Sequence, residues 1–288
     1  LSKTDNHSSE TGSHLTNDAN VPMGFAMLVE VKKAVAVHSQ TNDPILIVGE
    51  IGTGKEFIAK TIHQKSPKSS LPFLTLNCAT RRMHEIQSFL FPATKIKYTR
   101  ESKSSKTKPA THISQVIFLD NVNALTKTMQ EKLVTVLGSK ELGEQNFLPS
   151  RLYISSSKNL KELSENDQFS PDLLNIFEGT TIHIPPLREN SSSIPMMIRD
   201  HLEKTAQTDG QPLPKFDSMA LEALCSYAWP KNIRELHSVL DRIVATAPSR
   251  ESISLNEIPP GIRQTDTPFK ALESEKLGNY SQRTLKRS

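Results

Sequence analysis

The chain has 288 residues, a formal net charge of +4 and a hydrophobic fraction of 36%. This length is enough for one large or two small domains with a buried core, and the composition is that of a globular protein. No run of residues is long and apolar enough to cross a bilayer. The first residues of the given sequence are polar and show no signal-peptide pattern. The two cysteines, Cys78 and Cys225, form no C-x-x-C pair. We therefore expect a cytoplasmic protein without membrane partners.

Residues 1–20 are rich in Ser, Thr, Asn and Asp, which predicts a disordered linker. After a helix predicted over 26–37, apolar runs alternate with helical patterns as far as residue 187. Such alternation is typical of a parallel sheet that helices cover on both faces. The sequence thus predicts an α/β domain over 21–187, with strands at 45–48, 73–76, 116–119, 152–155 and 181–184.

A G-x-x-x-x-G-K pattern begins at Gly49, directly after the first predicted strand and directly before a helical pattern. In that context the pattern predicts a phosphate-binding loop, because glycines let backbone N–H groups and the helix N-terminus surround phosphate oxygens while the lysine adds a full charge. The sequence therefore predicts a nucleotide site that includes Gly49, Glu50, Gly52, Thr53, Gly54, Lys55 and Glu56.

The apolar run 116–119 ends in Asp120. A strand that ends in aspartate is common, but after a phosphate-binding loop it indicates a Walker B element whose carboxylate holds Mg²⁺ directly or through water. We expect Asp120 to be the metal-binding residue, with ATP as the cofactor that the metal accompanies.

Only helical patterns follow Pro185 and Pro186. One covers 194–205, a second begins at the predicted cap Asp217, and a third has an apolar stripe over 233–244. We interpret residues 188–262 as a helical lid subdomain. The remaining residues 263–288 are a basic tail that is either disordered or a DNA-binding element.

The chain resembles the AAA+ central domain of bacterial enhancer-binding proteins, the NtrC-like activators of sigma-54 RNA polymerase. The resemblance covers about residues 22–262 and is carried, in the family's order, by the segments 49–56, 73–79, 118–120, 185–189 and 229–236. It implies an AAA+ P-loop NTPase with a five-stranded parallel sheet and a helical lid. It also implies binding of ATP and Mg²⁺, a homo-oligomer, and a γ-phosphate contact from Arg234. Alternatively, Arg234 is an exposed helix residue paired with Glu235 or Asp241.

The chain departs from the family at positions that serve catalysis or sigma-54 contact. The G-A-F-T-G-A loop is expected after Phe91, but residues 92–100 read P-A-T-K-I-K-Y-T-R. Asn121 stands where the family's Walker B glutamate polarises water, and an amide cannot take up a proton at neutral pH. The polar sensor pair is Ser156 and Ser157, and the two arginine-finger positions hold the neutral Ser170 and Ile176. We therefore name no catalytic residue.

The sequence predicts a transcription regulator that binds ATP, hydrolyses it poorly and acts without sigma-54, through RNA polymerase or another regulator. An active ATPase that remodels RNA polymerase, or a nucleotide-free interaction scaffold, are the alternatives. Residues 275–285 resemble the recognition end of a Fis-type helix-turn-helix, which would contact DNA, although too few residues lie between 263 and 288 for the usual fold. Relatives that sense a cyclic dinucleotide make that ligand a further hypothesis, with no residue here that establishes it.

Overall fold

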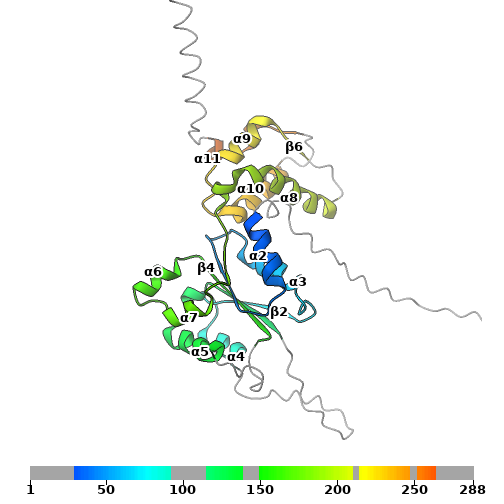
Figure 1. The fold of residues 1–288 in the computed structure, drawn as a ribbon. Helices are drawn as coiled ribbons and strands as arrows, with labels where there is room; N and C mark the ends of the chain where they lie inside the picture. The colour runs from blue at the N-terminus through cyan, green and yellow to red at the C-terminus, as the bar shows by residue number, and fades with distance from the viewer. Residues whose placement is uncertain (1–28, 92–114, 139–148, 210–213, 247–251, 264–288) are drawn as a thin grey trace, which may run out of the picture.

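The computed structural model describes residues 29–91, 115–138, 149–209, 214–246 and 252–263. Within these ranges an α/β part is followed by a smaller, mainly helical part that lies at one end of it (Figure 1). The predictions for residues 1–20, 92–100 and 264–288 fall outside the described residues. Among the helices that the structure describes, none combines the length and apolar character needed to span a bilayer.

A five-stranded parallel sheet forms the centre of the α/β part, in the spatial order β2-β3-β4-β1-β5. The central strands are apolar runs that are buried on both faces, as parallel sheets require. The predicted fold class is confirmed, and each predicted strand lies within one residue of its observed bounds. These are β1 (Ile45–Val48), β2 (Phe73–Asn77), β3 (Val116–Asp120), β4 (Arg151–Ser156) and β5 (Thr181–His183).

Two apolar cores lie on opposite faces of this sheet, because successive strand residues point to opposite sides. Leu46 belongs to the core under α4, α5, α6 and α7, whereas Ile45 and Ile47 belong to the core under α2 and α3. The helices are α2 (Val29–Ser39), α3 (Lys55–Gln64), α4 (Met83–Leu90), the short η1 (Val122–Ala124), α5 (Lys127–Gly138), α6 (Leu160–Glu165) and α7 (Pro171–Ile176).

The lid has its own apolar core, built around the fully buried Trp229. The side chain of Asp217 caps α9 by accepting a hydrogen bond from the N–H of Ala220 at 2.6 Å, as predicted. The lid elements are η2 (Leu187–Ser193), α8 (Ile194–Asp209), α9 (Ser218–Ser226), α10 (Asn232–Thr246), η3 (Leu255–Glu257) and α11 (Pro260–Arg263).

The prediction that only helices follow Pro186 is wrong. Two short strands, β6 (Lys215–Phe216) and β7 (Ser252–Ile253), pair in parallel beside the lid helices. Each strand has only two residues, so neither has room for the alternating pattern by which a strand is recognised in a sequence.

Candidate functional site

The loop between β1 and α3 forms a cradle because two of its glycines have left-handed backbones. Gly52 has φ 81° and Gly54 has φ 91°, conformations that side chains rarely allow. The helix α3 begins immediately afterwards at Lys55, so that its N-terminal end meets the loop. Lys55 is buried, and its Nζ donates to the carbonyl oxygens of Gly49 at 2.7 Å and Glu50 at 2.8 Å. The loop therefore places a cation at its own centre.

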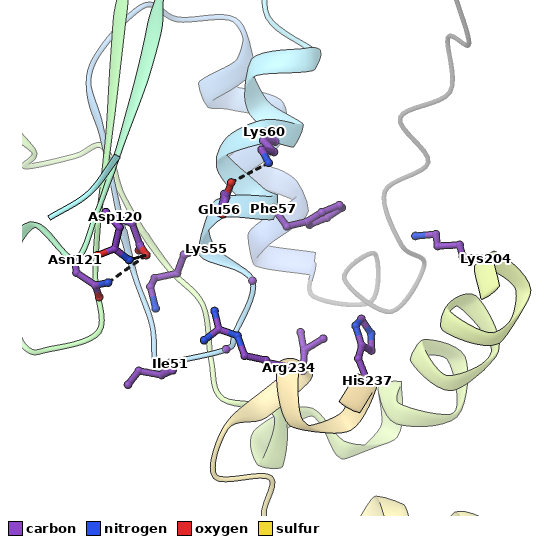
Figure 2. Close-up of a pocket in the computed structure, with 14 residues that line it drawn as sticks. Ile51, Lys55, Glu56, Phe57, Lys60, Asp120, Asn121, Lys204, Arg234 and His237 are labelled. Atoms are coloured by element: carbon purple, nitrogen blue, oxygen red, sulfur yellow. Dashed lines mark hydrogen bonds and ion pairs between the residues drawn. The ribbon is translucent and has the colours of Figure 1, made fainter. Parts of the chain in front are cut away.

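A cavity of about 740 Å³ opens above this loop and extends to the lid (Figure 2). The phosphate-binding loop and α3 line one side, the ends of β2 and β3 line a second, and α8 and α10 of the lid line a third. The lining residues are Ile51, Gly52, Gly54, Lys55, Glu56, Phe57, Lys60, Asn77, Asp120, Asn121, Lys204, Ile233, Arg234 and His237. The volume lies within the range typical of small-molecule sites.

Asp120 stands at the carboxyl end of β3 and is held by three neutral donors. Asn77 Nδ2 donates to its Oδ2 at 3.1 Å, Asn121 Nδ2 donates to the same oxygen at 3.2 Å, and Ser155 Oγ donates to Oδ1. Asn77 reaches it because β2 and β3 are in register there. A carboxylate fixed in this way on the cavity wall suits a divalent cation bound beside phosphate oxygens.

The charges around the loop affect one another. Burial lowers the pKa of Lys55, the negative charge of Asp120 opposes that shift, and the positive charge of Arg234 adds to it. Beside the same aspartate, burial raises the pKa of the Cys78 thiol to about 12, and the charge of Asp120 contributes to the increase. Cys78 is therefore an unreactive core thiol at neutral pH, as expected for a buried cysteine.

The lid supplies Arg234, which points into the cavity from the first turn of α10 (Figure 2). The alternative pairing of Arg234 with Glu235 or Asp241 is not found. Glu235 accepts from the N–H of Lys231 at 2.9 Å, and Asp241 contacts His201 at 2.6 Å. The lid arginine is therefore available to a ligand in the cavity.

His237, one turn beyond Arg234, lies on the same side of α10 and also lines the cavity. Its ring stacks on that of His201, with centroids 4.2 Å apart. Burial lowers the pKa of His237 to about 4, with a smaller contribution from the charge of His201, so that the ring is neutral at pH 7.

The predicted site residues separate into two groups. Gly52, Gly54, Lys55, Glu56, Asp120 and Arg234 line the cavity. Gly49, Glu50 and Thr53 belong to the loop but do not line the cavity. Thr53 Oγ1 donates to the carbonyl oxygen of Glu50 at 2.9 Å, and the side chain of Glu50 contacts the lid. The Mg²⁺ role of Asp120 and the nucleotide role of the other residues stay predictions.

Sequence reasoning missed several cavity residues. Asn77 could have been found, because it ends the strand beside β3 and the carboxyl ends of neighbouring parallel strands meet. His237 follows Arg234 by three residues, the spacing of one helix face, which was a usable signal. Phe57, Lys60 and Lys204 carry no local signal for this role.

The positions at which the sequence predicts a departure from the family have local structural roles in this chain. Asn121 has a left-handed backbone with φ 58°, a conformation that asparagine adopts more readily than most residues. Ser156 Oγ donates to the carbonyl oxygen of Lys158 at 2.9 Å. Ser170 caps α7 by accepting from the N–H of Leu173 at 3.2 Å, and Ile176 packs against the core.

These features define an α/β P-loop domain with a helical lid over its phosphate-binding loop. The family model described as "Sigma-54 interaction domain" matches residues 24–183, and the model described as "AAA+ ATPase lid domain" matches residues 188–275. The chain belongs to the Sigma-54 interaction domain family, that of NtrC-like AAA+ regulators of transcription.

Among its relatives, the transcriptional regulatory protein XylR of Pseudomonas putida is 35% identical over 239 residues, covering 80% of this chain and 42% of that protein. The Nif-specific regulatory protein of Azotobacter vinelandii is 34% identical over 232 residues, covering 76% of this chain and 44% of that protein. The chain thus spans less than half the length of these curated relatives.

Solved structures support the same fold. The structure of NtrX from Brucella abortus in complex with ATP is similar with a TM-score of 0.66 and 21% sequence identity, covering 96% of this chain and 63% of that one. A RuvB mutant from Thermotoga maritima is similar with a TM-score of 0.51 and 13% identity, covering 83% and 66% of the two chains.

Proposed function

We propose that this chain is a nucleotide-dependent regulator of transcription that binds ATP with Mg²⁺ and hydrolyses it very slowly. The observation that carries the proposal is that Lys55, Asp120 and Arg234 line one cavity. They supply an ammonium for the β- and γ-phosphates, a carboxylate for the cation and a guanidinium from the lid. The complexes of NtrX from Brucella abortus with ATP and with ADP support the choice of nucleotide.

Slow hydrolysis follows from the groups that stand at the transition-state positions. The side-chain nitrogen of Asn121 donates to Asp120, and the amide cannot accept a proton from the attacking water. Ser170 and Ile176 are neutral, so they provide no charge to a neighbouring subunit. Loss of an arginine finger alone costs a factor of about 10³ or more. ATP binding then serves as a structural or assembly signal, and ATP hydrolysis is not used as a source of free energy.

The partner is another form of RNA polymerase or another regulator, rather than the sigma-54 enzyme. Residues 92–100, which would contain the G-A-F-T-G-A loop, read otherwise, and they lie outside the described residues. The full protein works in the cytoplasm as a homo-oligomer that contacts DNA through a helix-turn-helix at or beyond the basic tail. A cyclic dinucleotide remains a hypothesis, because none of the contacts described above selects it over ATP.

Titration calorimetry with ATP and Mg²⁺ tests the proposal. We expect saturable binding to the unmodified chain and a loss of about 100-fold in affinity for Lys55→Ala, since one charge-assisted contact contributes about 1.5–3 kcal/mol. Lys127→Ala is the control, because Lys127 at the start of α5 forms a surface ion pair with Asp167, and neither residue lines the cavity.

The possible outcomes distinguish the three hypotheses about function: a nucleotide-binding regulator with slow hydrolysis, an active ATPase and a nucleotide-free scaffold. Binding without measurable turnover supports the proposal. Turnover that rises with protein concentration would favour an active ATPase that remodels RNA polymerase. No binding by a chain whose circular dichroism shows it folded would favour a nucleotide-free scaffold.

A further inference from the structure

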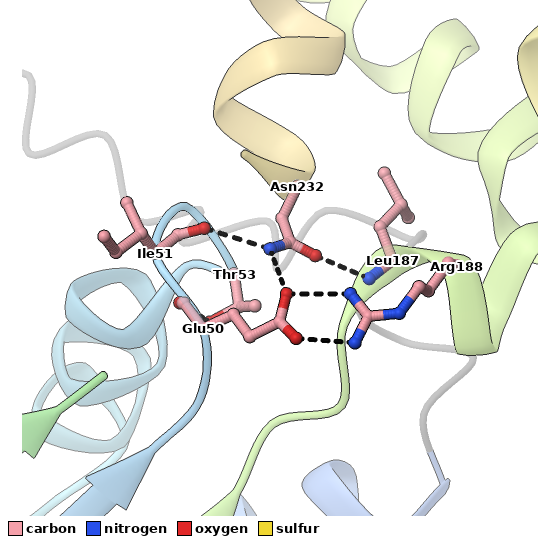
Figure 3. Close-up of polar contacts among 6 residues, drawn as sticks. All are labelled: Glu50, Ile51, Thr53, Leu187, Arg188 and Asn232. Atoms are coloured by element: carbon pink, nitrogen blue, oxygen red, sulfur yellow. Dashed lines mark hydrogen bonds and ion pairs between the residues drawn. The ribbon is translucent and has the colours of Figure 1, made fainter. Parts of the chain in front are cut away.

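Glu50 joins the phosphate-binding loop to the start of the lid by an ion pair (Figure 3). Its Oε2 accepts from Arg188 Nη1 at 2.9 Å and its Oε1 accepts from Arg188 Nη2 at 2.6 Å. Arg188 lies in η2, where the chain leaves the α/β part. The two parallel hydrogen bonds fix the relative orientation of the loop and this segment, as paired guanidinium–carboxylate contacts do.

Asn232, the first residue of α10, completes the connection from inside. It is fully buried, and its Nδ2 donates to Glu50 Oε2 at 3.1 Å and to the carbonyl oxygen of Ile51 at 3.0 Å. Its Oδ1 accepts from the N–H of Leu187 at 2.7 Å. One amide thus bridges the loop, η2 and α10. Its φ of 53° is left-handed, which favours asparagine at this position.

The backbones of the loop and the lid also touch. Arg234 N–H donates to the carbonyl oxygen of Gly52 at 3.4 Å. A Cβ atom on Gly52 would overlap the carbonyl oxygen of Lys231. The outer surface of the loop therefore lies directly against the beginning of α10, the helix that carries the cavity residues Arg234 and His237.

Glu50 has a second set of contacts, through its backbone. Its carbonyl oxygen accepts from Lys55 Nζ at 2.8 Å and from Thr53 Oγ1 at 2.9 Å. The same residue thus touches the lysine that faces the phosphates and, through its side chain, the lid. A displacement of Lys55 toward phosphate oxygens changes the hydrogen bonds of a residue whose carboxylate holds Arg188 and Asn232.

We infer that Glu50, Arg188 and Asn232 form a latch that fixes the lid against the phosphate-binding loop and transmits the state of the loop to the lid. They are positioning residues: they set where Arg234 stands over the cavity. The transmission part of this inference rests on the proposed ATP binding, whereas the latch itself does not. Because about two-fifths of both the Glu50 and Arg188 side chains is exposed, their ion pair is screened, and the buried Asn232 amide contributes the larger share.

Hydrogen exchange of two backbone amides in the full chain tests the latch without nucleotide. The N–H of Leu187 donates to Asn232 Oδ1, and the N–H of Arg234 donates to the carbonyl oxygen of Gly52. Exchange at these two amides therefore reports directly on the contact between the loop and the lid. We expect Glu50→Gln to speed exchange at both by about fivefold, and Asn232→Ala by more. Glu50→Gln combined with Arg188→Gln should have no greater effect than one of them alone, because both remove the same contact.

Two references separate loss of the latch from loss of the fold. The N–H of Val116, at the start of β3, donates to the carbonyl oxygen of Pro72, just before the edge strand β2, at 2.9 Å. This amide should keep its exchange rate in every variant. Lys127→Gln breaks an exposed ion pair of 2.7 Å that does not touch the lid, and should change neither reporter amide. Unchanged exchange at Leu187 and Arg234 in Glu50→Gln and Asn232→Ala would overturn the latch.

A second arm tests transmission by comparing exchange with and without ATP and Mg²⁺. We expect ATP to alter exchange at Leu187 in the unmodified chain, and this response to be lost in Glu50→Gln even where calorimetry shows ATP bound. An identical response in both proteins would overturn the transmission. If ATP does not bind the unmodified chain at all, the proposed function fails, while the nucleotide-free exchange still decides whether the latch exists.

Discussion

The carbonyl oxygen of Lys231 lies against Gly52, so that a Cβ atom at Gly52 would overlap it. Gly52 also has a left-handed backbone, with φ 81°. A glycine at position 52 is therefore required by the lid as well as by the local turn. The G-x-x-x-x-G-K pattern leaves this position variable, so the packing of α10 explains a glycine that the pattern itself does not require.

Gly52→Ala should consequently destabilise the chain more than a left-handed backbone alone explains. Gly179→Ala provides the comparison, because Gly179 has φ 82° and, within the part of the chain that the structure describes, no atom lies within 4 Å of its Cβ position. We expect a loss of about 1 kcal/mol at Gly179 and a further loss of about 1–3 kcal/mol at Gly52 from the overlap. Urea unfolding measures both.

Gly138→Ala serves as the neutral control for that pair. Gly138 ends α5, and no atom of the described residues lies within 4 Å of its Cβ position. Its substitution should change stability by less than about 0.5 kcal/mol. Equal losses at Gly52 and Gly179 would contradict the contact with Lys231.

The neutral His237 makes stability depend on pH. Its pKa is lowered from 6.5 to about 4 in the folded chain, mainly by burial, then by the charge of His201, with Asp241 opposing and Lys204 adding. In the unfolded chain the His237 ring becomes protonated below pH 6.5, whereas in the folded chain it stays neutral down to about pH 4. Stability from this residue is therefore complete above pH 6.5 and is lost as pH falls toward 4.

His237→Gln removes this titration at similar size. We expect the thermal midpoint of the variant to fall less than that of the unmodified chain between pH 6.5 and about 4. His183→Gln, at an exposed position in β5, is the matched control and should leave the pH profile unchanged. Parallel profiles for the unmodified chain and His237→Gln would show that the ring is not kept neutral in the folded state.

The phosphate-binding loop and Asp120 could be predicted from the sequence because their determinants are local. Each follows an apolar run, and parallel strands bring their carboxyl ends to one edge of the sheet. The contact of the Glu50 side chain with the lid could not be predicted in this way. Its partner Arg188 is 138 residues away, and neither residue has a neighbour in sequence that indicates the other.

The lid shows the same limit. Its amphipathic helices and the Asp217 cap follow from periodicity and capping, so they were predictable. Which helix face meets the cavity depends on how the lid packs on the loop. That packing is set by the turn before α10, where Trp229 and Asn232 both have positive φ. A positive φ is uncommon for tryptophan, although asparagine adopts it more readily, and the composition of the turn does not specify this pair of conformations.

We predict that the protein does not activate transcription by sigma-54 RNA polymerase. The family's G-A-F-T-G-A contact sequence is absent from residues 92–100, where basic residues stand instead. An open-complex assay with purified sigma-54 holoenzyme and ATP measures this, with an activator that contains the loop as the positive control. Robust ATP-dependent transcription by the unmodified chain would refute the prediction and place the contact elsewhere in the protein.

Restoring the acidic residue alone should not restore hydrolysis. Asn121→Glu returns a proton acceptor, but it removes the hydrogen bond to Asp120 and places a second carboxylate beside it. It also puts glutamate at φ 58°, where asparagine is better tolerated. The predicted finger positions, Ser170 and Ile176, remain neutral. Since these groups act at one transition state, their effects are strongly non-additive, and turnover should stay far below about one per second.

Phosphate release at saturating ATP, over a range of protein concentrations that allows assembly, measures this turnover. Ordinary enzymatic rates in the unmodified chain would mean that Asn121 is not at the catalytic position. A large gain from Asn121→Glu alone would mean that an arginine outside the predicted finger positions supplies the missing charge. Arg188 is the first residue to test, by adding Arg188→Gln to Asn121→Glu. Because Arg188 is paired with Glu50 of the same chain and belongs to the latch, a loss of turnover would identify it as the missing finger only if adding Glu50→Gln to Asn121→Glu, which breaks the same pair, does not cause that loss.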